Sequence, residues 1–117
     1  MQKITVAFDC DGTLVTTDSA ETKRVVANER IRTLLVILAS FKNVRIVIWS
    51  GGGEVWARQV GRELGLDKYV WQYMDKIYLG RGEDGKIKFG TEFVPDIAID
   101  DIQACELGVL NLIVREK

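Results

Sequence analysis

Short apolar segments alternate along the chain with longer amphipathic segments. The short segments are rich in Val and Ile, as buried strands are, and several end at a carboxylate, a hydroxyl group or a glycine. Over residues 28–41, apolar side chains recur at three- and four-residue spacing, which predicts a helix capped by Asn28. A second amphipathic segment predicts another helix, and Gly65 is a residue type that commonly follows the C-terminal end of a helix. The pattern predicts strands over residues 3–8, 44–49, 76–79, 96–99 and 109–114, and helices over 28–41, 53–64 and a short stretch ending near 107.

Alternating strands and helices predict an α/β protein whose mostly parallel, five-stranded sheet is covered on both faces. A length of 117 residues suits one core, so we expect residues 1–117 to form a single domain. Residues 13–27 are polar without a clear period, which indicates a loop or a small flap. The sequence Glu83-Asp84-Gly85 lies between two apolar segments and predicts a hairpin turn.

Composition and charge narrow the possible functions. The chain has no histidine, which excludes histidine-based triads and most histidine-containing metal sites. A net charge of −1 gives no general affinity for nucleic acids or anionic membranes, and no segment approaches the roughly 18 to 20 apolar residues of a membrane span. The first apolar segment is too short for a secretory signal, and Cys10 and Cys105 lie far apart. We therefore expect a cytoplasmic protein.

Three polar groups follow predicted strands at the points where the strands end. They are Asp9-Cys10-Asp11-Gly12-Thr13, Ser50-Gly51-Gly52-Gly53 and Asp100-Asp101. Because parallel strands point their carboxyl ends to one edge of the sheet, the fold gathers four carboxylates and a hydroxyl group there. Crowded carboxylates repel one another unless a cation lies among them, and ligation by oxygen alone favours Mg²⁺ over Zn²⁺. The sequence therefore predicts a hard divalent cation at this edge.

These elements resemble those of the haloacid dehalogenase superfamily, whose phosphohydrolases use an aspartate nucleophile. The resemblance rests on Asp9-x-Asp11-Gly12-Thr13 after the first strand, Ser50 after the second and Asp100-Asp101 after a later one, in the family's order. It implies a three-layer α/β/α, Rossmann-like fold. By the same resemblance, Asp9 forms an aspartyl-phosphate, and Asp11 acts in turn as general acid and general base.

The resemblance also implies how phosphate and metal are held. Asp9, the main chain of Asp11 and an acidic residue, either Asp100 or Asp101, would bind Mg²⁺, which neutralises charge on carboxylate and phosphate. Ser50 would donate a hydrogen bond to a phosphoryl oxygen, with help from main-chain N–H groups. The expected phosphate-binding group is Gly12, Thr13, Ser50, Gly51 and Gly52.

The family also uses a lysine that precedes the Asp-Asp strand. Lys76, Lys86 and Lys88 are the candidates, and Arg81 could replace a lysine electrostatically. We favour Lys88, because the predicted hairpin returns it to the level where the third strand ends.

The spacing of the motifs bears on the substrate. About forty residues separate Asp9 from Ser50 and about fifty separate Ser50 from Asp100, which leaves no room for a large cap domain. We expect an open cleft for a phosphate ester, either a small molecule or the exposed phosphate end of a macromolecule, and a homo-oligomer could help to close it. Tyr69, Trp71 and Tyr73 are expected to be buried under the hairpin, and a platform for a stacked nucleobase is the alternative.

Two competing interpretations are disfavoured. A phosphoaccepting receiver domain carries its paired acids after the first strand, whereas here the Asp-Asp pair comes late. A calcium-binding loop that starts at Asp9 would need Gly and Glu where Leu14 and Ala20 stand. A phosphotransferase, or a non-catalytic phosphate-binding or regulatory protein of the same fold, stays open.

Overall fold

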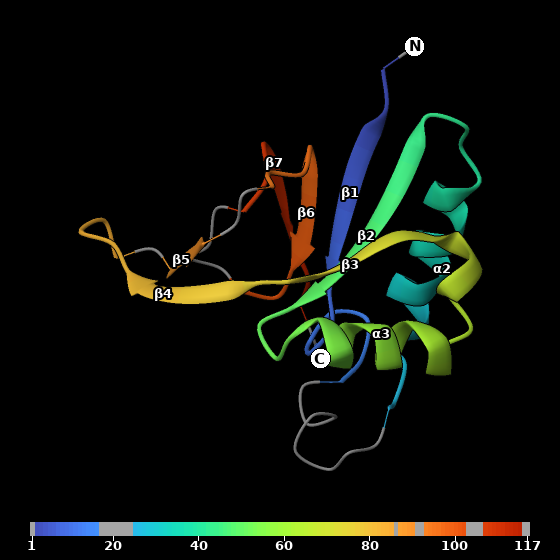
Figure 1. Ribbon diagram of the computed structural model, residues 1–117, viewed down its shortest axis with the longest axis horizontal. Helices are drawn as coiled ribbons and strands as arrows, with labels where there is room; N and C mark the ends of the chain where they lie inside the picture. Colours follow the sequence, from blue (N-terminus) through green and yellow to red (C-terminus); the bar gives the residue numbers. More distant parts are fainter. Residues whose placement is uncertain (1, 17–24, 86, 91–92, 103–106, 116–117) are drawn as a thin grey trace.

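The protein has a parallel five-stranded sheet at its centre (Figure 1). The computed structural model describes residues 2–16, 25–85, 87–90, 93–102 and 107–115, apart from the side chains of 78 and 87–90. All neighbouring strands pair in parallel, which confirms the predicted α/β class. In spatial order the strands are β3 (Val70–Asp75), β2 (Val44–Ser50), β1 (Ile4–Asp9), β6 (Ile97–Asp100) and β7 (Leu110–Ile113).

Two α-helices connect the first three strands of the sheet. They are α2 (Glu29–Ala39) and α3 (Glu54–Glu63), and a short 3-10 helix, η1 (Asp67–Tyr69), precedes β3. Both helices lie where the apolar spacing predicts them, and Gly65, at φ +71°, follows the end of α3. Among the described residues, no helix combines the length and the apolar character needed to cross a membrane.

Both α-helices cover the same face of the sheet. Val6, Phe8, Ile46 and Ile48 of β1 and β2 share a core with Leu35, Ala57 and Val60 of the helices. Right-handed crossovers that run from β1 to β2 and on to β3 put both helices on one side. The described residues therefore form a sheet with one helical layer, where we expected two.

The opposite face is packed by residues outside the α-helices. Ala7, Val47, Trp49 and Ala98 of the strands form a second core cluster with Leu107, against which Phe93 and Ile102 pack. The chain moves from β1 to β2 and β3 toward one edge of the sheet, but from β6 to β7 toward the other edge. A right-handed connection between β6 and β7 is therefore expected on the face opposite to the α-helices. The short helix predicted to end near 107 includes residues 103–106, which lie outside the described part of the chain.

The third strand of the sheet is not the segment that the sequence pattern favoured. Residues 76–79 were expected there, but β3 ends at Asp75, and β4 (Ile77–Arg81) pairs antiparallel with β5 (Ile87–Gly90) in a separate sheet of two strands. The reason is position: β3 lies at the edge and is only partly buried, so its sequence lacks the continuous apolar character of a central strand. The hairpin with a turn near Gly85 is confirmed, and it extends away from the main sheet (Figure 1).

The aromatic residues of this region follow the edge strand. Tyr69 and Tyr73 pack against the core on the helical side, whereas Trp71 is 45% exposed. The Arg45 guanidinium lies 3.9 Å from the centroid of the Trp71 ring, and the ring of Phe93 lies 6.4 Å away. The expected burial under the hairpin is therefore wrong for Trp71, and Tyr69 and Tyr73 are instead partly buried on the helical side. Of the predicted flap, Val15 forms isolated bridges with Asp11 and Ala27, and residues 17–24 lie outside the description.

Candidate active site

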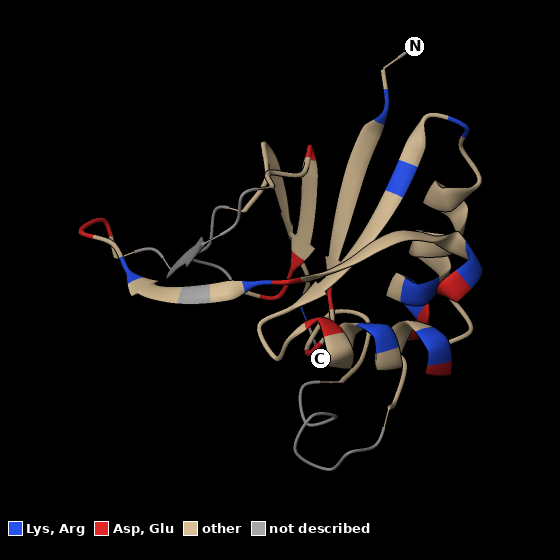
Figure 2. Ribbon diagram, in the orientation of Figure 1, with Lys and Arg blue, Asp and Glu red and all other residues tan. Residues whose placement is uncertain are grey.

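The predicted polar groups meet where the order of the strands changes direction. From β1 the chain builds the sheet outward through β2 and β3, and it then returns to the other side of β1 as β6. β1 and β6 are adjacent and parallel, so Asp9 and Asp100 end neighbouring strands. In α/β sheets, ligands bind beyond the carboxyl ends of the strands at such a switch point. Acidic segments gather at this end of β1 and β6 (Figure 2).

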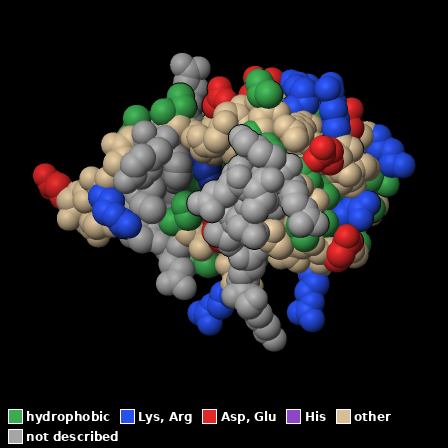
Figure 3. All heavy atoms as spheres, turned by 90° about the horizontal axis from the view of Figure 1, so that it is seen from below, with side chains coloured by type: hydrophobic (Ala, Val, Ile, Leu, Met, Phe, Trp, Pro, Cys, Tyr) green, Lys and Arg blue, Asp and Glu red, His purple; other side chains and the backbone are tan. Residues whose placement is uncertain are grey.

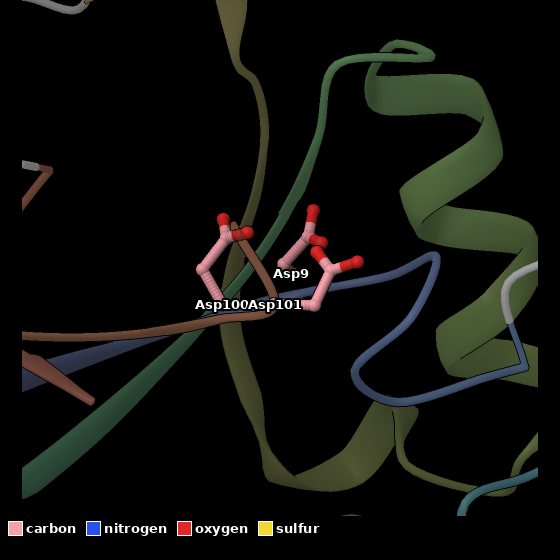
Figure 4. Close-up of side chains that lie close together, drawn as sticks. All are labelled: Asp9, Asp100 and Asp101. Atoms are coloured by element: carbon pink, nitrogen blue, oxygen red, sulfur yellow. The ribbon is translucent and has the colours of Figure 1, made fainter. Parts of the chain in front are cut away.

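Three carboxylates form the centre of this site (Figure 4). One carboxylate oxygen from each of Asp9, Asp100 and Asp101 lies within 4.8 Å of the other two. Asp9 and Asp100 are only 6% and 5% exposed, and Asp101 is partly buried. Three buried or partly buried acids so close together need positive charge nearby.

Lys76 supplies one positive charge. Its Nζ lies 2.8 Å from Oδ1 of Asp9 and 2.6 Å from Oδ2 of Asp100. The main-chain N–H of Lys76 donates to the Ser50 carbonyl at 2.9 Å, so the ends of β2 and β3 fix its position. Burial would lower the pKa of this ammonium group, but Asp9 and Asp100 outweigh that effect and raise it. Lys76 is therefore charged.

The lysine beside the carboxylates is thus one of the alternatives and not the favoured candidate. Lys88 lies in β5, where its main chain pairs with Gly80, and its side chain is outside the described part of the protein. Arg81 donates to the Gly85 carbonyl in the hairpin. Lys86 is itself among the residues that the structure does not describe. Lys76 is the lysine whose contacts support a role in the site.

Burial also changes the carboxylates themselves. It raises the pKa of Asp9 to about 7; Lys76 opposes this rise, and Asp100 and Asp101 add to it. The pKa of Asp101 is raised to about 6, first by burial and then by its contact with Asp100. One ammonium group therefore leaves these carboxylates electrostatically unsatisfied at neutral pH.

The loop after β1 depends on Gly12. Gly12 has φ +79°, and a Cβ built on it would lie 2.1 Å from Oδ2 of Asp101. Cys10 is fully buried in the core, and its carbonyl accepts hydrogen bonds from the main-chain N–H groups of Thr13 and Val15. The Thr13 hydroxyl is 3.5 Å from Oδ2 of Asp9, so Thr13 supports the carboxylate.

Asp11 is held from the neighbouring helix. Nε1 of Trp56, in the first turn of α3, donates to Oδ2 of Asp11 at 3.1 Å. Asp75, the last residue of β3, accepts a hydrogen bond from the main-chain N–H of Glu54 at the start of the same helix. Neither contact has a signal in the sequence, and Trp56 also packs against the core.

Ser50 and the glycines after it form the third side of the site. The main-chain N–H of Gly52 donates to Oγ of Ser50 at 2.9 Å. The hydroxyl oxygen therefore acts as an acceptor in the loop, and its own proton is available to donate to a ligand oxygen. Ser50 is nearly fully buried, whereas Gly51 and Gly52 are exposed.

A cleft of about 280 Å³ joins these groups. It is lined by Asp9, Asp11, Ser50, Gly51, Gly52, Lys76, Asp101 and Ile102. Lys and Arg side chains stand mostly at the rim of this end of the molecule (Figure 3). The structure thus brings most of the predicted residues to one cavity, and Asp100, Gly12 and Thr13 each lie next to a residue that lines it.

The donor set fits a hard divalent cation. Mg²⁺ binds oxygen at about 2.1 Å, so two of its ligands lie up to roughly 4.2 Å apart, and small adjustments of the three carboxylates would meet this geometry. Comparisons with protein-family models, with curated proteins and with solved structures found no match to this chain. The residues of the site and the motifs they form are therefore the basis for a function.

Proposed function

We propose that the protein is a Mg²⁺-dependent phosphohydrolase that cleaves a phosphate monoester through an aspartyl-phosphate on Asp9, as its resemblance to the haloacid dehalogenase superfamily implies. One observation carries the proposal. Lys76 bridges Asp9 and Asp100 beside a cleft that Asp11, Ser50, Gly51 and Gly52 also line. A nucleophile, a second carboxyl group and phosphate-binding donors are thus within reach of one bound group.

In the first step, a carboxylate oxygen of Asp9 attacks phosphorus and the bond from phosphorus to the ester oxygen breaks. Asp11 gives its proton to that oxygen, so the leaving group departs as an alcohol. Asp11 lines the same cleft as Asp9 but is held by Trp56, whereas Asp9 is held by Lys76. Two carboxyl groups can act as nucleophile and as acid when their surroundings differ, because different surroundings favour different protonation states.

In the second step, water attacks the phosphorus of the aspartyl-phosphate and the bond to Asp9 breaks. Asp11, now a carboxylate, accepts the proton of the attacking water, which restores both side chains and releases inorganic phosphate. The open cleft leaves room for this water and suits a substrate that is either a small ester or the phosphate end of a larger molecule.

Charge decides whether an anionic ester can approach these acids. Asp9, Asp100 and Asp101 would hold the Mg²⁺ ion, which supplies neutralising charge when bound. Lys76 offsets the charge of Asp9 before attack and that of the phosphoryl group afterwards, and Ser50 donates to a phosphoryl oxygen.

Hydrolysis of 4-nitrophenyl phosphate with and without Mg²⁺ tests the proposal. Wild type should turn over only with the ion, and Asp9→Asn should lose nearly all activity because an amide is a poor nucleophile. Glu63→Gln, the same acid-to-amide change at an exposed position on α3, is the control and should behave as wild type.

Two results would change the assignment. Equal rates for wild type and Asp9→Asn contradict the role of Asp9 as the nucleophile. A stable phosphoprotein with negligible turnover would instead favour a phosphotransferase or a regulatory protein.

A further inference from the structure

We propose that Trp56 is a positioning residue for Asp11 and fixes the orientation of the carboxyl group that protonates the leaving group. The inference rests on the proposed function, because it takes Asp11 as the general acid and base. It adds a residue that packs against the core and has no acid–base chemistry of its own.

The first observation is a hydrogen bond between distant parts of the chain. Trp56 Nε1 donates to Oδ2 of Asp11 at 3.1 Å, across 45 residues of sequence. The side chain of Asp11 lines the cleft, and Trp56 is partly buried behind it. The indole therefore ties α3 to the loop after β1.

The second observation is packing against a different loop. A Cβ built on Gly52 would lie 3.4 Å from Cδ1 of Trp56, so the indole borders the main chain of Gly52 directly. The N–H of Gly52 in turn donates to Oγ of Ser50. One side chain thus contacts both the loop that carries Asp11 and the loop that positions Ser50.

The helix that carries Trp56 is itself anchored. The main-chain N–H of Glu54 donates to the carboxylate of Asp75, and the N–H of Ala57 donates to the Gly53 carbonyl at 3.1 Å. The first turn of α3 is therefore fixed to the end of β3. A donor on such a turn holds its acceptor better than a donor on a free loop would.

The chemistry of indole suits this task. Its N–H only donates hydrogen bonds and does not titrate, so it can hold Asp11 while the carboxyl group gives up and regains a proton. The hydrogen bond to Oδ2 therefore fixes the orientation of the Asp11 carboxyl group. Trp56→Phe keeps an aromatic ring at this position and removes the donor together with part of the ring volume.

Leaving-group dependence separates positioning from a structural role. An alkyl phosphate needs a proton on its leaving oxygen, whereas 2,4-dinitrophenyl phosphate does not. We expect Trp56→Phe to lower kcat/KM for the alkyl ester at least ~10-fold and for the dinitrophenyl ester less than about twofold. Trp71→Phe, the same change on exposed β3, should leave both values unchanged. An equal loss on both esters, or no loss on either, would overturn the proposal.

The contact also has a readout that does not depend on activity. In a ¹H–¹⁵N spectrum, the indole resonance that is lost in Trp56→Phe identifies Trp56. In Asp11→Ala this resonance should shift, and its N–H should exchange faster with solvent. An unchanged resonance would overturn the hydrogen bond.

The failures of the two proposals are distinguishable. A wild-type protein that hydrolyses neither ester contradicts the proposed function. An active wild type whose Trp56→Phe variant shows no dependence on the leaving group overturns the role of Trp56 alone.

Discussion

Oδ2 of Asp101 occupies the space that a side chain at residue 12 would need. A Cβ on Gly12 would come within 2.1 Å of that oxygen and 2.6 Å of the carboxyl carbon. The loops after β1 and β6 can therefore approach each other only because residue 12 is glycine. This close approach is what allows the carboxylate of Asp101 to join that of Asp9.

Gly12→Ala should damage the carboxylate cluster as well as the fold. The positive φ of residue 12 costs an alanine about 1–2 kcal/mol, and the clash displaces Asp101 in addition. We expect a lower free energy of unfolding and weaker Mg²⁺ binding, measured by urea unfolding and by calorimetric titration.

Gly85→Ala is the matched control for this substitution. Gly85 has nearly the same backbone angle, φ +78°, but a Cβ there meets no atom of the described residues within 4 Å. Gly85→Ala should lower the free energy of unfolding only by the cost of its positive φ, and its Mg²⁺ binding should be unchanged. Equal effects of the two substitutions on Mg²⁺ binding would contradict the clash with Asp101.

One simple rule predicts much of the site from the sequence. Polar residues directly after parallel strands meet at one edge of the sheet, and this rule finds Asp9, Ser50 and Asp100. It would also find Lys76, which directly follows β3. Lys76 was not favoured because the third strand was predicted over residues 76–79, which places the lysine at the start of a strand and not after its end.

The remaining contacts have no comparable signal in the sequence. Trp56 reaches Asp11 only because of how α3 is rotated and where its axis lies against the sheet, and packing fixes both. The approach of Asp101 to Gly12 likewise depends on two loops that are far apart in the chain. Periodicity describes single elements, so it cannot predict contacts that arise between elements.

Lys76→Met should strongly destabilise the protein in the absence of metal. Removing one partner from a buried ion pair costs about 3–5 kcal/mol, because Asp9 and Asp100 are left buried without their counter-charge. We expect Mg²⁺ to restore more stability to this variant than to wild type, measured by thermal unfolding in EDTA and in Mg²⁺. Lys42→Met, at an exposed lysine, should change little. A loss that is equal in both buffers would contradict this electrostatic account.

Asp75→Ala should loosen the start of α3. Its carboxylate accepts a hydrogen bond from the N–H of Glu54, and loss of such a capping contact costs about 1 kcal/mol. Asp75→Asn keeps an acceptor oxygen and should retain most of the stability. Because α3 carries Trp56, we also expect faster exchange of the Trp56 indole proton in Asp75→Ala. If both variants were as stable as wild type, the carboxylate would not anchor the helix.

Without metal, the protein should become less stable as the pH rises from about 5 to 7.5. Burial raises the pKa of Asp9 to about 7 and that of Asp101 to about 6, whereas in the unfolded chain both ionise near pH 4. Between these values the folded state binds more protons than the unfolded state, so the free energy of unfolding falls with increasing pH.

Urea unfolding in EDTA across this range measures the effect. Asp9→Asn should show a shallower decline, because it removes the larger of the two shifted groups. Mg²⁺ should flatten the wild-type profile at its upper end, since a cation that binds the ionised cluster stabilises the folded state by mass action. A free energy of unfolding that rises with pH in EDTA would mean that Lys76 alone compensates the buried carboxylates.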